Sequence, residues 1–378
     1  MPRLLLLGSG LAHLHVLRAW RRAAMASVEL VVVAPAAHDY SGMVPGFVRG
    51  AYESAEIRID VAALAQRAGA RFVDGLATRV SAASRVVDTT AGPLEFDFCS
   101  IDVGGGAGGA SIPGVREHAI ALRPMTGAHA LRSALDARCA AGTPFGVVVA
   151  GAGAGGVEIA LAMQRRIADA GARGAVTLVD AGGALLPHEP AGLRETVTSL
   201  LRERGVGLVL GAAVTDVGSD MLQLASGAEL SADIVVWLAG GEPPPLLQAS
   251  DLRTDDAGYL LVDDTLAVLD AAGRVWGAGD CIALAGGPVI PRSGAYAVRQ
   301  GSILLANLLA ALGRGKRRRY RPRVRSLVLL DLADGRAAAR WGPFHGTGTL
   351  AWSLKRLIDR RYVRQFREEC DERAAPRS

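Results

Sequence analysis

The sequence predicts an α/β fold with two strand–helix–strand units, the second inserted into the first, and a small C-terminal region. The first unit opens the chain with an apolar strand at 3–7, a glycine-rich turn, a helix over 12–24 and a strand at 28–33. The second unit repeats this order near the middle of the 378 residues. The strands of both units are continuous apolar runs, which is typical of parallel strands covered on both faces.

The second unit carries the clearer glycine motif. After an apolar strand at 145–150, Gly151, Gly153 and Gly156 open a helix predicted over 155–170. This spacing predicts a dinucleotide site of the Rossmann type: the first glycine permits a tight turn, the second a close approach to a pyrophosphate, and the third close packing of helix on strand.

Asp180 ends the second strand of this unit, predicted over 175–179. A carboxylate at this point accepts hydrogen bonds from ribose hydroxyls and repels a 2′-phosphate, so it favours NADH over NADPH. The alternative is a glycine-rich turn followed by a surface aspartate.

The opening loop is a variant of the same motif. Gly8 and Gly10 are in place, but His13 stands where the third glycine is expected, and no acidic residue ends the next strand. A later stretch, 275–281, places Asp280 after a turn of small residues at the end of a strand. Such an aspartate can bind the ribityl hydroxyls of a flavin.

Two nucleotide loops and a late Gly-Asp resemble the flavoproteins with two dinucleotide-binding domains, a superfamily that includes glutathione reductase relatives, type II NADH dehydrogenases and sulfide:quinone reductases. In that superfamily the first loop holds FAD and the second NAD(P)H. "SIDVGGG" (100–106) and "VVWLAGG" (235–241) resemble its two chain crossings between domains. Short alternating segments at 71–89 and 206–241 are predicted to form antiparallel meanders after each unit.

A closer resemblance covers nearly the whole chain. "YSGMVPGFVRGAY" (40–52), "PRSGAYAVRQG" (291–301) and "RLIDRRYVRQF" (356–366) are similar to the FAD-dependent module fused to selenophosphate synthetase in some bacteria. His13 fits that subgroup, which often lacks the third glycine. The motifs and the resemblance together assign the following cofactor-binding residues: Gly8, Ser9, Gly10, Ala12, His13, Ser41, Gly42, Gly104, Gly151, Gly153, Gly156, Asp180, Gly240, Gly279, Asp280 and Ala297.

Glu158 is the candidate catalytic residue. It completes the Gly-x-Gly-x-x-Gly-x-Glu arrangement of type II NADH dehydrogenases. In those enzymes the glutamate lies near the nicotinamide and the flavin, and the resemblance implies the same position for Glu158. The alternative is a glutamate of the first helical turns that complements the helix dipole. One departure concerns the acceptor: type II enzymes usually have Thr-Ala-Gln at the start of a late helix, and this chain has Ser-Gly-Ala at 293–295.

The four cysteines argue against two other chemistries. Cys99, Cys139, Cys281 and Cys370 form no Cys-x-x-Cys pair and no ligand cluster, so no metal site is expected. The stretch 40–47 lacks the cysteine pair that disulfide reductases need. Cys281 is expected to be a small buried residue.

Composition and charge bear on location and partners. The net charge is +5, concentrated in the basic stretches 313–325 and 354–367, which indicates either an anionic partner or a solvated basic tail. With no signal peptide and no long apolar run, we expect a cytoplasmic protein. No recognition helix for nucleic acid is apparent.

The C-terminal helix is the candidate membrane contact. Leu350, Leu354, Leu357, Ile358, Tyr362 and Phe366 are predicted to share one face bordered by basic residues. Such a helix can lie peripherally on the inner face of the cell membrane. The alternatives are a helix docked on the FAD domain and a homodimer contact.

The sequence thus predicts a first FAD-domain segment (1–117), an NAD(H)-binding domain (118–252), a second FAD-domain segment (253–315) and a C-terminal β-plus-basic-helix region (316–378). Hydride transfer between two cofactors needs orientation rather than a protein acid or base. We expect an FAD-dependent NAD(P)H dehydrogenase that passes electrons to a quinone or another small acceptor. The alternative is a flavoprotein that senses redox state or docks to a partner without efficient turnover.

Overall fold

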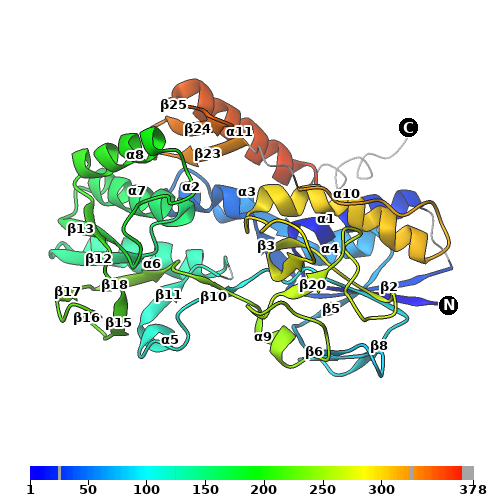
Figure 1. Ribbon diagram of the computed structural model, residues 1–378. Helices are drawn as coiled ribbons and strands as arrows, with labels where there is room; N and C mark the ends of the chain where they lie inside the picture. The colour runs from blue at the N-terminus through cyan, green and yellow to red at the C-terminus, as the bar shows by residue number, and fades with distance from the viewer. Residues whose placement is uncertain (24–26, 124, 323–326, 368–378) are drawn as a thin grey trace.

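The computed structural model describes residues 1–23, 27–123, 125–322 and 327–367. Its two halves, each built on a parallel sheet, lie side by side, and a C-terminal layer lies across the top of both (Figure 1).

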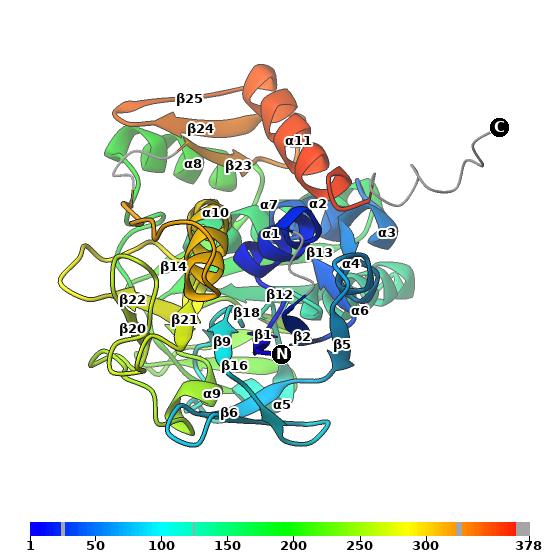
Figure 2. The same ribbon diagram turned by 90° about the vertical axis from the view of Figure 1, so that its right-hand side faces the viewer.

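The first sheet has the strand order β21-β9-β1-β2-β5, with every neighbouring pair parallel. Its strands are β1 (Arg3–Leu7), β2 (Glu29–Ala34), β5 (Arg71–Asp74), β9 (Phe98–Ile101) and β21 (Val275–Gly277). β21 pairs with β9 although more than 170 residues separate them in sequence (Figure 2). The chain therefore leaves this sheet, builds the second unit and returns, as the predicted insertion requires.

The second sheet has the order β11-β18-β12-β13-β14 and is also parallel throughout. Its strands are β11 (Ala119–Ala121), β12 (Phe145–Ala150), β13 (Gly174–Asp180), β14 (Gly207–Leu210) and β18 (Ile234–Trp237). The helices α6 (Gly127–Ala141), α7 (Ala154–Asp169) and α8 (Ala191–Glu203) accompany it. Val147, Val149, Leu178 and Val236 of this sheet are at most 1% exposed, as expected for covered parallel strands.

Two helices from opposite ends of the chain cover the first sheet. α1 (Leu11–Trp20) and α10 (Gly294–Ala311) lie against each other (Figure 2). A methyl group at Gly301 would lie 2.7 Å from Cβ of His15, so glycine lets the two helices approach closely. The predicted α1 region ends earlier as an α-helix, because 21–23 form a 3-10 turn.

The two predicted meanders are wrong at their outer strands. β5 and β14, predicted as antiparallel, are parallel edge strands of the two main sheets, and β18 lies inside the second sheet. The antiparallel meanders consist of β6 (Ala77–Ser81), β7 (Val86–Thr89) and β8 (Leu94–Glu95), and of β15 (Val214–Val217), β16 (Met221–Leu224) and β17 (Glu229–Ser231). Alternation in a four-residue strand does not reveal which neighbour it pairs with, because pairing is decided by tertiary contacts.

Shorter elements connect these layers. They are β3 (Ala37–Asp39), the 3-10 turn η2 (Ser41–Met43), α2 (Val44–Arg49), α3 (Ser54–Ile57), β4 (Arg58–Asp60), α4 (Val61–Arg67), β10 (Gly106–Ala107), α5 (Val115–His118), β19 (Gly241–Glu242), α9 (Pro245–Gln248), β20 (Leu260–Val262), the 3-10 turn η3 (Gly279–Cys281) and β22 (Ile282–Leu284). β10 pairs antiparallel with β19 where the chain crosses between the halves.

The C-terminal layer consists of an antiparallel sheet, β23 (Leu327–Asp331), β24 (Ala337–Trp341) and β25 (Phe344–Gly348), followed by α11 (Thr349–Arg364). Ion pairs Arg204–Asp334 and Arg340–Glu189 attach it to the second half. Lys355 Nζ donates to the carbonyl of Gly42, 2.8 Å away, and attaches it to the first half. The layer therefore bridges both halves (Figure 2).

The predicted apolar face of α11 is wrong as one continuous face. Leu350, Leu354, Leu357 and Ile358 are 42–86% exposed. Phe366 is buried, and Tyr362 stacks on Tyr40 with ring centroids 4.8 Å apart. The helix turns Lys355, Asp359 and Val363 toward the protein. The two charged side chains find hydrogen-bond partners there. Among the described residues, no helix combines the length and apolar character needed to cross a membrane.

Candidate functional site

The second glycine loop has the geometry that its motif predicts. Gly151 has φ +114°, and a methyl group there would lie 2.7 Å from the amide nitrogen of Ala239. A methyl group at Gly156 would lie 1.7 Å from the carbonyl oxygen of Gly151, so this position must be glycine. Gly153 is the N-cap of α7, no side chain caps it, and nothing lies within 4 Å of its missing Cβ. The start of α7 is therefore open to an anion.

Asp180 lies beside this loop, as predicted. One carboxylate oxygen accepts a hydrogen bond from the amide of Ala152, and the other from the amide of Gly182, each at 2.6 Å. Each carboxylate oxygen has a second lone pair, so Asp180 can still accept from a ribose hydroxyl. It also fixes the loop on which its ligand would rest.

The first loop is organised by Asp102, a residue that the sequence analysis did not single out. Asp102 follows β9, is 1% exposed, and accepts hydrogen bonds from the amides of Ala12 (2.9 Å) and His13 (3.0 Å). A methyl group at Gly10 would lie 2.0 Å from its Oδ1. Burial raises the pKa of Asp102 to about 6, and the two amides act against this shift. Asp102 thus caps α1 from a distant strand.

His13 explains why the third glycine is dispensable here. Its ring is fully buried, with Nδ1 2.8 Å from the carbonyl oxygen of Gly8 and Nε2 2.8 Å from Oγ of Ser100. Burial lowers its pKa to about 4, so the ring is neutral, and it can donate to the carbonyl and accept from the hydroxyl. The side chain ties the loop to β9 instead of letting helix and strand approach closely.

The late Gly-Asp turn lies against this first loop. Gly279 has φ +75°, a methyl group there would lie 2.2 Å from Oδ1 of Asp102, and its amide donates to Oε1 of Gln300 at 2.6 Å. Asp280 is next to it, and burial raises the pKa of its carboxyl. Ala297 is buried on α10, three residues before Gln300. The structure thus brings Gly8, Gly10, Ala12, His13, Gly279 and Asp280 together.

The two chain crossings meet between the halves. Gly104 has φ +76° with nothing within 4 Å of its missing Cβ, and Gly240 is exposed with φ +66°. A methyl group at Gly240 would approach Cα of Gly108 to 3.7 Å. Apart from their chain neighbours, no side-chain atom lies within 4 Å of the missing Cβ of Gly104 or Gly240, so the backbone is accessible at these two points of the junction.

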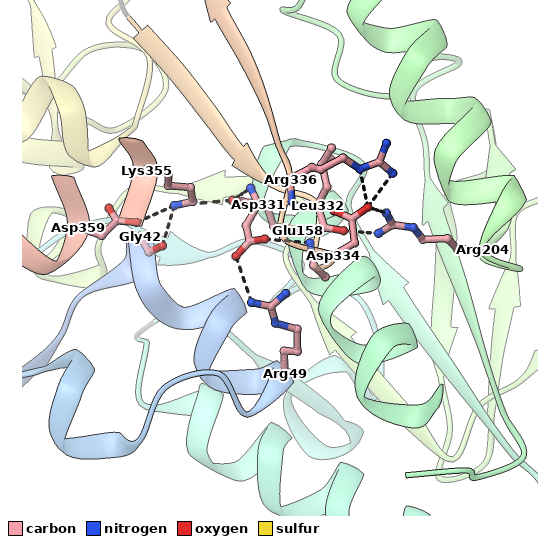
Figure 3. A network of polar contacts seen from close by, with 11 residues as sticks. Gly42, Arg49, Glu158, Arg204, Asp331, Leu332, Asp334, Arg336, Lys355 and Asp359 are labelled. Atoms are coloured by element: carbon pink, nitrogen blue, oxygen red, sulfur yellow. Dashed lines mark hydrogen bonds and ion pairs between the residues drawn. The ribbon is translucent and has the colours of Figure 1, made fainter. Parts of the chain in front are cut away.

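Glu158 lies in a buried polar network between the two halves and the C-terminal layer (Figure 3). Its Oε1 accepts from the amide of Asp331 at 2.7 Å and lies 3.9 Å from Nζ of Lys355. Lys355 also donates to Asp359 Oδ2 at 2.9 Å and to the carbonyl of Gly42. Arg49 approaches Asp331 to 3.9 Å. The structure thus connects Glu158 with Gly42 through a lysine that sequence reasoning missed.

The charge balance of this network controls the protonation of Glu158. Burial raises the pKa of Glu158 to about 7, and Lys355 and the amide of Asp331 oppose the shift. Asp331 and Asp359 raise it further by repulsion. Glu158 therefore holds or releases a proton close to neutral pH, which is the property required of a proton-exchanging group.

Two further residues named in the sequence analysis are Ser41, predicted to bind a cofactor, and Cys281, predicted to be a small buried residue. Ser41 is exposed, at the start of η2, in front of α2. Cys281 is fully buried and its thiol donates to the carbonyl of Ala278 at 3.1 Å, so it packs as a small residue. Burial raises the pKa of this thiol well above its usual range. Cys370 lies outside the described residues.

The site residues fit a dinucleotide at both loops, with one difference. At the second loop the helix start is open and an acid lies beside it. At the first loop, Asp102 already takes the amides of Ala12 and His13. A pyrophosphate there needs donors other than these two amides.

Comparison with known proteins agrees with this geometry. A family model for pyridine nucleotide-disulphide oxidoreductases matches residues 2–301. The chain is 30% identical over 176 residues to the type II NADH:quinone oxidoreductase of Haemophilus influenzae, covering 43% of this chain and 39% of that protein. It is 30% identical over 227 residues to an NADH dehydrogenase-like protein of Mycobacterium tuberculosis, covering 57% and 56%. The chain thus spans little more than half the length of these relatives at most.

Solved structures share the fold. NDH2 from Plasmodium falciparum in complex with NADH gives a TM-score of 0.83 at 13% identity, with 97% of each chain covered. The sulfide:quinone oxidoreductase of Aquifex aeolicus gives 0.82 at 15% identity, covering 97% of this chain and 92% of that one. The match of the family model to residues 2–301 shows that the chain belongs to the pyridine nucleotide-disulphide oxidoreductase family.

Proposed function

We propose that this protein is an FAD-dependent NADH dehydrogenase that passes electrons to a quinone. The observation that carries the proposal is the pairing of two glycine loops, each at the carboxyl end of a parallel strand, with the two chain crossings between them. The names of the type II NADH:quinone oxidoreductase of Haemophilus influenzae and the demethylphylloquinone reductase of Synechocystis support quinone as the acceptor.

In this proposal the first loop, Gly279 and Asp280 hold FAD, and the second loop and Asp180 hold NADH. FAD, when bound, accepts hydride from the nicotinamide and passes electrons to the acceptor. Asp180 favours NADH because its carboxylate repels a 2′-phosphate. Glu158 exchanges the proton that quinone reduction consumes, and Lys355 sets how readily it does so.

The exposed side of the C-terminal layer supports a peripheral membrane position. Leu350 is 86% exposed, Phe344 76%, Leu357 63% and Trp341 53%. Arg356, which stacks on Trp352 at 4.6 Å, and Arg360 lie on the same helix. Apolar side chains together with basic ones suit the interface of an anionic bilayer. This position would bring the site to quinone dissolved in lipid.

Vesicle experiments test the membrane part. The double variant L350S/L357S should sediment less with anionic vesicles than the wild type, while L76S/V289S, which alters exposed apolar residues elsewhere, should not differ from the wild type. Equal sedimentation of all three proteins would contradict the membrane position. Concentration-dependent association that the first variant abolishes without vesicles would instead assign this face to a second copy of the chain.

A further inference from the structure

The strand β25 forms a free edge of the C-terminal sheet. The sheet has the order β23-β24-β25, so β25 pairs with β24 on one side only. Its free edge points away from the two halves (Figure 2). Among the described residues, no backbone hydrogen bond joins the middle of β25, residues 345–347, to any element other than β24. A strand of another chain can therefore extend the sheet here.

The hairpin turn fixes which residues of β25 point outward. A two-residue turn at 342–343 joins the strands, and its first residue, a glycine, has φ +59°, as a type II′ turn requires. In such a hairpin the pair next to the turn exchanges hydrogen bonds, and the direction of bonding then alternates along the strand. Phe344 therefore bonds to β24, whereas the N–H and C=O groups of His345 and Thr347 point outward.

This edge is neither charged nor covered. Edge strands usually carry charged residues or lie under another element, which prevents pairing with a second chain. β25 has the sequence FHGTG and is exposed at four of its five positions. Every other described strand with two or more exposed residues carries a charged residue, namely β4, β5, β6 and β17. Edge strands without charge, such as β11, β14 and β21, are half-buried or buried at most of their residues.

The inner face of β25 holds the strand in position on α8. A methyl group at Gly192 would lie 2.7 Å from Nε2 of His345. Arg340, opposite His345 on β24, forms an ion pair with Glu189. The other face is open at Gly346, where nothing lies within 4 Å of the missing Cβ. The strand is therefore anchored from one side, and its free edge offers backbone groups in a fixed geometry.

We infer that β25 pairs antiparallel with β25 of a second copy of the chain, about a two-fold axis at Gly346. In this register His345 of one copy exchanges hydrogen bonds with Thr347 of the other, and the axis repeats the pair. Every outward backbone group of the two residues finds a partner. The two C-terminal sheets become one continuous sheet.

The side chains of the open face fit the same two-fold axis. Gly346 lies opposite Gly346 of the second copy, and Phe344 lies opposite Gly348 of the second copy. Nothing lies within 4 Å of the missing Cβ of either glycine, so the Phe344 ring, 76% exposed, has room to cover the glycine that it faces. β25 contains no lysine, arginine, aspartate or glutamate. No like charges meet across the axis, which favours a second copy as the occupant.

The inference does not rest on the proposed function, and it removes a cost of the proposed membrane position. A bilayer offers no hydrogen-bond partners to an open sheet edge. Pairing of β25 satisfies this edge within the protein. Leu357 and Trp341, which lie outside β25, remain available to lipid.

Charge changes at the axis test the pairing. G346E and G346K each place like charges opposite each other, whereas a mixture of the two variants places opposite charges there. The open space at Gly346 accommodates either side chain in the single copy. S231E and S231K, at an exposed position of the edge strand β17, are the matched controls. Sedimentation velocity of the full-length holoprotein over a wide range of concentration measures association, and flavin absorbance with urea unfolding checks that each variant is folded.

We expect the wild type and both Ser231 variants to form dimers. G346E and G346K should each raise the dimer dissociation constant at least tenfold, and their mixture should recover dimers. Amide hydrogen exchange of a peptide that spans 344–348 should slow as the wild-type concentration rises, and should not slow in G346E.

Three results would overturn the inference: a wild type that is monomeric at every concentration, a dimer that both Gly346 variants retain, and a dimer that L350S/L357S loses but G346E retains. The last result would assign association to the apolar face of α11. Wild-type dimers that do not sediment with anionic vesicles would contradict the membrane position and leave this inference intact.

Discussion

The two glycine loops differ in how they close at the residue scale. In the second loop, Gly156 lets α7 approach the strand until no side chain fits. In the first, His13 fills the corresponding position and bonds Gly8 and Ser100, while Asp102 caps the helix. The turn between strand and helix is therefore held by the His13 side chain in the first loop and by close packing at a glycine in the second.

Restoring the usual glycine at the first loop should accordingly destabilise the protein. H13G removes a fully buried ring and leaves the Ser100 hydroxyl without its partner, so we expect a loss of about 3 kcal/mol in the free energy of unfolding. S100A, which removes one hydrogen bond, should cost about 1 kcal/mol. Urea unfolding measures both. An H13G variant as stable as the wild type would show that the ring does not support the loop.

The raised pKa of Glu158 predicts a pH dependence of stability. Its pKa is about 7 in the folded protein, against an ordinary value of 4.5, so between these pH values the folded state binds more protons than the unfolded state. The contribution of Glu158 therefore falls as pH rises through this window, by roughly 3 kcal/mol. E158Q should lose this decline, whereas E117Q, on the surface, should retain it. Urea unfolding curves at pH 5 and pH 7.5 measure this decline. If the free energy of unfolding falls equally for E158Q and the wild type between these pH values, the raised pKa is not that of Glu158.

Local patterns explain which site residues could be predicted from the sequence. Gly151, Gly153 and Gly156 lie within six positions, and Asp180 ends the strand paired with theirs, so spacing suffices. Asp102 lies about 90 positions from Ala12 in sequence, and Lys355 lies about 200 positions from Glu158. Nothing in the local sequence indicates that these two residues are buried, because an aspartate before glycines and a lysine in a basic helix are both common at the surface.

At the scale of elements, α11 is the clearest case of tertiary contacts changing a predicted face. Helical periodicity groups six apolar residues, yet the helix buries Lys355 and Asp359 and exposes Leu350 and Leu354. The apolar pattern therefore did not indicate which side of the helix the protein covers. Short strands behave similarly: β5 and β14 have the expected positions but a different pairing.

Lys355 makes α11 part of the fold. K355M leaves Glu158 and Asp359 buried without their closest cation, so we expect a loss of about 3–5 kcal/mol in the free energy of unfolding. K355R should recover part of this, because it restores the charge with a different geometry. R356M, one residue further along the helix and outside the network, is the matched control. If K355M and R356M unfold at the same urea concentration, the network does not stabilise the docked helix.

At the scale of the whole molecule, the C-terminal layer joins the two halves and offers an apolar outer face. Its inner side reaches Glu158 on α7 and Gly42 on η2, and its outer side carries Leu350, Leu357 and Phe344. The insertion of the second unit was predictable, because the two glycine loops and the late Gly-Asp turn mark where the chain leaves the first unit and returns to it. How the layer lies across the halves was not, since its contacts involve single charged side chains.

The central claim is that electrons pass from NADH through a bound flavin to a quinone, and anaerobic stopped-flow absorbance of the purified holoprotein tests it most directly. We expect NADH to bleach the flavin absorbance faster than NADPH does, and a soluble quinone to restore that absorbance within the time of one turnover. D180A should bring the two nucleotides closer together. A correctly folded protein that binds no flavin, or a bound flavin that NADH reduces and no quinone reoxidises, would contradict the claim.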